Sequence, residues 1–209
     1  MDWKILLAGL LLAAAFLYGF GALFNRQRSQ AVLRWLAAGA KHAGKPSAVH
    51  WRGRMHAAGR LDVTDLRPPY RTMVLIFVLE RRDNLPVWLF KHFKGQRDEL
   101  FIHADLRSLP DPEIEAGPQG SRSVQSRLFQ RDAGYRKKND SGIFDIAWRG
   151  KESHSTLTRV QRFLHKYPKA NLRFSLGQES PHLALRVNLG PLLRQSPEQF
   201  FDDLREAVR

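Results

Sequence analysis

The chain contains no cysteine among its 209 residues. This absence excludes disulfide bonds, thiol catalysis and the zinc or iron–sulfur sites that depend on cysteine ligands. It does not identify the compartment, because both cytosolic domains and domains of the cell envelope can lack cysteine. The location of the protein has to be inferred from other features.

Acidic residues are absent between Trp3 and Leu61, and within this stretch Ile5–Phe24 carries no charge of either sign. As a helix, these 20 residues would reach about 30 Å at roughly 1.5 Å per residue, which matches the hydrocarbon core of a bilayer. Every side of that helix would be apolar, whereas a buried core helix of this length is expected to show a polar face. The sequence therefore predicts an N-terminal transmembrane anchor at residues 1–24.

A cleaved signal peptide is the main alternative to an anchor. Signal peptides have a shorter apolar core that is followed by a cleavage site with small residues. Gly19-Phe20-Gly21 is a poor candidate for such a site. Trp3 and Tyr18 lie near the two ends of the run and Trp35 lies shortly beyond it, as aromatic residues do at membrane interfaces. We therefore favour an uncleaved signal-anchor, with Ile5–Phe24 inserted in the lipid bilayer.

Basic residues on the C-terminal side of the run predict the orientation. Asp2 and Lys4 precede the run, whereas no acid accompanies the five cations that follow it, namely Arg26, Arg28, Arg34, Lys41 and Lys45. The positive-inside rule then keeps the C-terminal side in the cytoplasm. We expect a single-pass protein of the cell inner membrane with a cytoplasmic soluble domain. An anchored extracytoplasmic binding domain is the alternative, because long domains translocate largely regardless of charge.

Beyond the anchor, the pattern predicts an α+β fold. Residues 25–45 are expected to form a basic juxtamembrane helix that ends before Pro46. Residues 46–209 are expected to form one soluble domain, with a mostly antiparallel sheet of about six strands packed with two or three helices. Residues 108–142 are rich in glycine, proline and polar residues, and are predicted to be a long irregular excursion.

Several individual elements can be assigned from periodicity. The continuous apolar run Thr72–Glu80 predicts a central strand buried on both faces, and Glu99–Leu106 alternates like a strand with one buried face. Asn171–Leu176 and His182–Leu189 are predicted to form a hairpin. Helices are expected over Ser153–Tyr167 and after Ser196, where a capping box with proline at the first helical position begins the last helix.

The net charge of +14 at pH 7 belongs entirely to the part after the anchor and implies an anionic partner surface. The candidates are phospholipid headgroups, an acidic protein and nucleic acid. The basic stretch Arg122–Lys138, with Phe129 and Tyr135 interleaved, has the composition of a nucleic-acid-binding segment. A solvated loop is the ordinary interpretation of such a stretch, and a membrane tether argues against nucleic acid as the partner.

The segment Pro86–Lys94 combines aromatic and basic residues, as elements that lie among lipid headgroups do. The more ordinary expectation for so short a helix is that Trp88, Leu89 and Phe93 close over the sheet as core. If the segment instead meets lipid, an anchor would strengthen that weak contact. The residues with a predicted membrane-surface contact are Arg26, Arg28, Arg34, Lys41, Lys45, Trp88, Lys91 and Lys94.

No catalytic motif is present: the chain has no nucleophile elbow, glycine-rich phosphate loop, H-E-x-x-H or dinucleotide fingerprint. The one metal-like set would join His50, His56, His103 and Asp105, but Arg52 and Arg54 disfavour a cation there. We therefore predict no catalytic residue, metal or cofactor. The expected role is binding or assembly at the membrane surface, with anionic headgroups and another envelope protein as partners. A membrane-bound enzyme acting on a lipid or phosphorylated substrate is the alternative.

Overall fold

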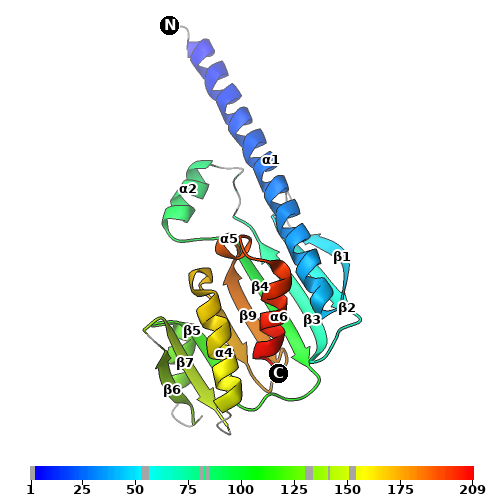
Figure 1. Ribbon diagram of the computed structural model, residues 1–209. Helices are drawn as coiled ribbons and strands as arrows, with labels where there is room; N and C mark the ends of the chain where they lie inside the picture. Colours follow the sequence, from blue (N-terminus) through cyan, green and yellow to red (C-terminus); the bar gives the residue numbers. More distant parts are fainter. Residues whose placement is uncertain are drawn as a thin grey trace.

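The computed structural model describes residues 3–52, 57–80, 82, 85–129, 134–140, 142–150 and 154–209. These residues form an α+β fold in which helices pack on a nine-stranded antiparallel sheet (Figure 1). The predicted fold class is confirmed. The sheet has three strands more than the six expected. The stretch predicted to be irregular contributes two strands, and the extended segment between Lys45 and Thr64 forms two strands.

The strands follow the order β1-β2-β3-β4-β9-β8-β5-β7-β6 across the sheet. Their bounds are β1 Lys45–Arg52, β2 Ala58–Thr64, β3 Tyr70–Val78, β4 Glu99–Leu106, β5 Glu113–Pro118, β6 Arg136–Asp140, β7 Phe144–Arg149, β8 Arg173–Leu176 and β9 Leu183–Asn188. The helices are α1 Trp3–Ala43, α2 Leu85–Phe93, α3 Arg122–Phe129, α4 His154–Lys166, the 3₁₀ turn η3 Pro168–Ala170, α5 Leu189–Leu192 and α6 Pro197–Ala207.

Helix α1 is one continuous helix of 41 residues, so the predicted anchor and the predicted juxtamembrane helix are a single element. Its first half projects from the domain with its side chains exposed, and the helix is long and apolar enough to span a membrane (Figure 1). Its second half packs on the domain through a buried stripe that starts at Asn25 and continues through Ser29, Val32, Leu36 and Ala40. The projecting half and the packed half thus meet close to Phe24.

Trp35 belongs to the core, and its predicted place at a membrane interface is wrong. Its ring lies 5.6 Å from that of Phe200 and 6.1 Å from that of Phe201, and its indole N–H donates to the Gln195 carbonyl at 3.0 Å. A Cβ at Gly39 would come within 2.4 Å of the Phe201 ring. Glycine at this position therefore permits the close approach of α1 and α6.

The core lies on one face of the sheet, beneath α1, α4 and α6 (Figure 1). The predicted alternation of β4 is confirmed, with four consecutive inward residues buried: Leu100, Ile102, Ala104 and Leu106. Strand β3 is not buried on both faces as predicted. Its inward Leu75 is fully buried, whereas Val78 on the other face is 43% exposed. On that face, the described helix α3 covers only the part of the sheet formed by β5 and β7.

The segment predicted to be an irregular excursion holds β5, α3 and β6. Strand β5 has the sequence Glu-Ile-Glu-Ala-Gly-Pro, in which acids, glycine and proline are untypical of a strand. Its backbone nevertheless pairs with β7 on one side and β8 on the other. Two further predictions of local structure are confirmed. Strands β8 and β9 form the expected hairpin, and Ser196 caps α6 by accepting the Gln199 N–H at 3.2 Å.

Candidate membrane-facing site

Helix α2 is attached to the domain by the polar atoms of its inner face. The indole N–H of Trp88 donates to Glu80 Oε2 at 2.6 Å, and Nδ1 of His92 lies 3.3 Å from the same oxygen. Trp88 and His92 are four residues apart, so one turn of helix brings both side chains to the same side. Because the Glu80 side chain is only 3% exposed, this carboxylate is a fixed point for α2.

The outer face of α2 is apolar and open. The exposed fractions are 45% for Val87, 44% for Leu89, 60% for Phe90 and 84% for Phe93. The expectation that Leu89 and Phe93 close over the sheet is therefore wrong. A nine-residue helix is too short to be stable on its own, so its exposed apolar face is maintained by the Glu80 contacts. Contiguous exposed apolar side chains of this kind indicate an interaction surface.

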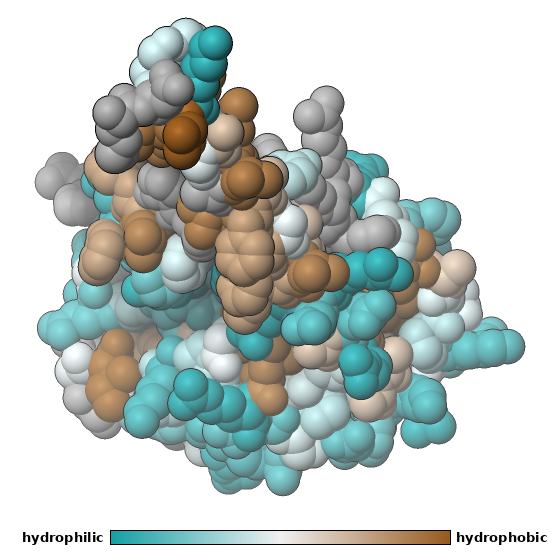
Figure 2. Space-filling model, turned by 90° about the horizontal axis from the view of Figure 1, so that it is seen from above, coloured by the Kyte–Doolittle hydropathy of each residue, from teal (hydrophilic) through white to brown (hydrophobic). Residues whose placement is uncertain are grey.

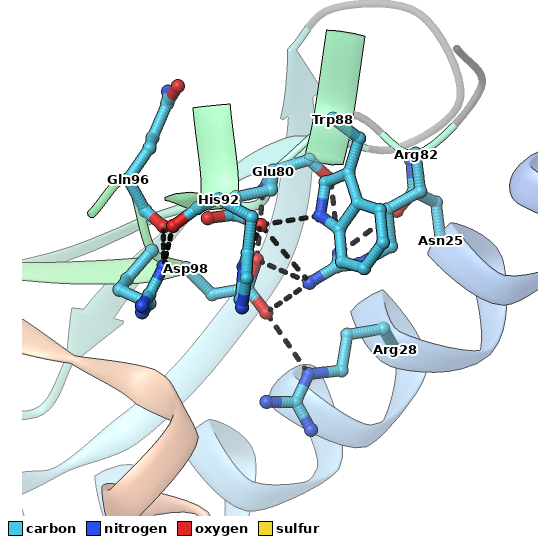
Figure 3. A network of polar contacts seen from close by, with 9 residues as sticks. Asn25, Arg28, Glu80, Arg82, Trp88, His92, Gln96 and Asp98 are labelled. Atoms are coloured by element: carbon cyan, nitrogen blue, oxygen red, sulfur yellow. Dashed lines mark hydrogen bonds and ion pairs between the residues drawn. The ribbon is translucent and has the colours of Figure 1, made fainter. Parts of the chain in front are cut away.

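A buried polar network joins the two ends of the α2 segment to α1 (Figure 3). The Arg82 guanidinium donates to both oxygens of Asp98, at 3.1 and 3.2 Å, and to Asn25 Oδ1 at 3.2 Å. From α1, Arg28 Nε donates to Asp98 Oδ2 at 3.2 Å. The Glu80 backbone N–H adds a further bond to Asp98 Oδ1 at 2.8 Å. Arg82 and Asp98 flank α2 in the chain, so both the entry to this helix and the exit from it are fastened to α1.

The network places α2 at the end of the apolar half of α1. The Arg82 guanidinium lies 5.3 Å from the centre of the Phe24 ring and 5.7 Å from that of the Trp88 ring. Phe24 is the last residue of the uncharged run, and Asn25 is the first buried polar residue after it. Seen from above, apolar side chains gather in the upper left and the centre of the view, and hydrophilic residues are frequent toward the lower and right edges (Figure 2).

The residues predicted to contact the membrane surface fall into two groups. Arg26, Arg28, Trp88, Lys91 and Lys94 all belong to the end of the domain from which α1 projects. Arg34, Lys41 and Lys45 lie farther along the chain and farther from the projecting half of α1. Lys41 is 17 residues beyond Phe24, or about 26 Å at 1.5 Å per residue, and Lys45 begins β1.

The same end of the domain carries a feature that sequence reasoning missed, a hollow of about 760 Å³ that we term the cationic hollow. No acidic side chain lines it. Five cations do, contributed by α1, the loop before β4, the end of α4 with η3, and the turn after α5: Arg28, Arg97, Lys166, Lys169 and Arg194. These residues are scattered over the sequence and follow no pattern, so only the overall charge excess hinted at the hollow.

The proposed metal-like set is not assembled. His50 on β1 and His103 on β4 are separated by two intervening strands, a distance of roughly 14 Å at about 4.8 Å per strand. His56 lies outside the described residues. Within the described part of the chain, no three histidine or carboxylate side chains are grouped as metal ligands.

Asp105, Ser180 and His182 do lie together, but their connection is structural. The Ser180 hydroxyl donates to Asp105 Oδ1 at 2.7 Å, and His182 Nδ1 accepts the Leu106 N–H at 2.9 Å. In a nucleophilic triad the serine hydroxyl is hydrogen-bonded to the imidazole, whereas here the Ser180 hydroxyl is hydrogen-bonded to the carboxylate. The hydrogen bonds from Ser180 and Thr72 lower the pKa of Asp105. This cluster fastens the β8–β9 turn to β4.

Comparison of the chain with models of protein families and with curated protein sequences finds no match. The functional interpretation therefore rests on the geometry of the end of the domain from which α1 projects.

Proposed function

We propose that this protein is a single-pass membrane module with a binding or assembly role at the cytoplasmic surface of the inner membrane. In this proposal α1 crosses the bilayer and α2 lies in the interface beside it, so that the domain is held against the membrane at two points. The observation that carries the proposal is the exposed apolar face of α2 at the level where the apolar half of α1 ends.

The energetics favour a bilayer as the surface that covers α2. Full burial of a Phe, Leu or Val side chain contributes about 1.5–3 kcal/mol, and partial burial in the interface contributes less. A free helix this short would not bind lipid stably, but α1 would keep it at high effective concentration beside the membrane. Lys91 on α2 and Lys94 directly after it are both exposed and would meet anionic headgroups, where each gains about 1 kcal/mol.

The domain also offers a surface for a protein partner. On the sheet face opposite the core, Val78 is 43% exposed, and Val74, Ile76 and Phe101 are partly exposed on β3 and β4. The described helices leave this part of the face uncovered. It supports the second half of the proposal, in which the anchored domain presents a binding face to another protein of the envelope.

The absence of cysteine makes a clean labelling experiment possible. We attach an environment-sensitive fluorophore to Phe93→Cys in the full chain and reconstitute the protein in phosphatidylcholine vesicles. We expect the fluorophore to emit at a shorter wavelength there than the same fluorophore does free in aqueous buffer. Lipids carrying a quencher near the headgroup should quench this fluorophore. The control is Gln178→Cys, an exposed site in the β8–β9 turn at the opposite end of the domain. Equal spectra and equal quenching at the two sites would contradict the proposal.

A further inference from the structure

The cationic hollow has an excess of positive charge that the acidic side chains of the described residues do not neutralise. Arg28 is paired with Asp98 and Lys166 with Asp203, at 3.2 and 2.7 Å, and neither acid lines the hollow. Arg97 is held by the carbonyls of His92 and Gln96, both at 2.7 Å. Within the described residues, Arg97, Lys169 and Arg194 make no ion pair with an acidic side chain. Three positive charges thus remain available to a ligand.

Helix electrostatics explain only part of this arrangement. Lys166 and Lys169 lie at the C-terminal end of α4 and in η3, where cations are favoured by the helix dipole. Arg97 belongs to the loop between α2 and β4, and Arg28 belongs to α1, so neither is placed by that dipole. Four separate segments therefore supply like charges to one hollow, which costs repulsion unless an anion occupies it.

The depth of the hollow matches the headgroup layer of a bilayer. Arg28 lies four residues, one turn, beyond Phe24, which corresponds to about 6 Å along the helix. The headgroup region adds roughly 5–7 Å on each side of the hydrocarbon core. Arg28 on the rim of the hollow would therefore lie at the level of the lipid phosphates when the uncharged run spans the core.

We propose that the cationic hollow binds the phosphate group of an anionic membrane lipid. Guanidinium groups match phosphate oxygens in a two-pronged geometry, and the hollow offers three of them, Arg28, Arg97 and Arg194. The wall also includes Pro191 and Leu193, partly exposed apolar groups suited to the glycerol and first methylenes of a lipid. The inference rests on the proposed function, because the hollow meets headgroups only when this end of the domain faces the bilayer.

The test compares two charge-reversed forms of the full chain. Lys169→Glu/Arg194→Glu alters two exposed residues of the hollow. Arg67→Glu/Arg71→Glu is the control with the same change in net charge. Its residues are exposed and lie at the opposite end of the domain, where the Arg67 N–H donates to the carbonyl of Ala43, the last residue of α1. Each protein is reconstituted in nanodiscs of phosphatidylcholine with or without phosphatidylglycerol.

Native mass spectrometry after release from the nanodiscs counts the phosphatidylglycerol molecules that remain bound. We expect wild type and the control to retain them alike, and the hollow variant to lose at least about tenfold in affinity, or about 1.4 kcal/mol. Equal retention by all three proteins would overturn the inference. So would an equal loss in the hollow variant and the control, because the effect would then be one of net charge.

Two further arms separate the possible failures. Inorganic phosphate added to phosphatidylcholine nanodiscs tests a soluble phosphate source: if phosphate stabilises wild type against thermal unfolding while phosphatidylglycerol does not, the lipid assignment is wrong. The Phe93→Cys fluorophore reports the membrane contact of α2 independently. A blue-shifted fluorophore without selective lipid retention refutes the hollow alone, whereas selective retention without a shift refutes the α2 contact alone.

Discussion

At the scale of single residues, Glu115 on β5 shows how the interior treats a carboxylate that makes no ion pair within the described part of the chain. The residue is 9% exposed beneath α3, and burial raises its pKa although hydrogen bonds from Ser175 and Ser123 oppose the shift. The folded state therefore binds a proton more tightly than the unfolded state does. Stability contributed at this position is lost as pH rises from the unfolded pKa, about 4.3, through the raised folded value.

We expect Glu115→Gln to raise the thermal unfolding temperature at neutral pH by a few degrees, because the amide keeps the hydrogen bonds and carries no charge to desolvate. The gain should shrink as pH falls through 4, because glutamate becomes protonated in both states below its unfolded pKa. Thermal unfolding of the full chain in detergent across this pH range measures it. Glu113→Gln is a control for which we expect the opposite effect on the unfolding temperature at neutral pH. Burial alone would raise the pKa of Glu113, but hydrogen bonds from Arg149 and Tyr135 lower it. A pH-independent gain in Glu115→Gln would contradict this account.

At the scale of elements, α2 is a helix whose position depends on its inner face rather than on packing of a core. Replacing Trp88 with phenylalanine keeps an aromatic ring and removes the N–H that donates to the buried Glu80 carboxylate at 2.6 Å. A buried acceptor that loses its donor costs about 1–3 kcal/mol. Because α2 makes few other contacts with the domain, this cost falls on the attachment of the helix and leaves the sheet intact.

Hydrogen exchange of the full chain tests this dependence. We expect amides of residues 85–93 to exchange about tenfold or more faster in Trp88→Phe, at a cost of about 1.4 kcal/mol or more, while β3 and β4 keep their protection. Phe93→Ala is the matched variant, since it removes an exposed ring and leaves the Glu80 contacts in place. Unchanged exchange in Trp88→Phe, or an equal effect in Phe93→Ala, would show that Glu80 does not hold α2.

The elements also show which features the sequence could and could not predict. The uncharged run, the alternation of β4 and the capped start of α6 are local patterns, and all three appear as expected. The Arg28–Asp98 pair joins residues 70 positions apart, and the cationic hollow draws on residues from Arg28 to Arg194. No local periodicity encodes such meetings. The exposure of α2 was missed for the same reason, because its amphipathic segment fits a core and a membrane surface equally well.

At the scale of the whole molecule, the continuity of α1 has the largest consequence. The helix that would cross the bilayer is the same helix whose buried stripe, from Asn25 onward, packs against α6 and the sheet. No flexible linker separates the two halves. The proposed membrane segment therefore fixes the height and tilt of the domain, and the network at Asp98 sets α2 and the cationic hollow at one level. Lipid contact at that end would need little reorganisation of the protein.

The orientation of this assembly can be tested through its charge asymmetry. Five Lys/Arg and no acid occur within Asn25–Lys45, whereas Lys4 is accompanied by Asp2 before the run. Loop charges count within about 15–20 residues of a membrane helix. We expect a green fluorescent protein fused to the C-terminus to fluoresce and an alkaline phosphatase fused there to be inactive, as both are for a cytoplasmic C-terminus.

Changing Asp2→Lys together with Arg26→Gln and Arg34→Gln should shift part of the population to phosphatase activity, because the excess of cations moves toward the N-terminal side. Arg28 is left in place since it pairs with the buried Asp98. Arg67→Gln/Arg71→Gln removes two cations far outside the window and should leave both reporters unchanged. An active phosphatase on the wild-type chain would place the domain, and the anionic surface it is proposed to bind, on the other side of the membrane.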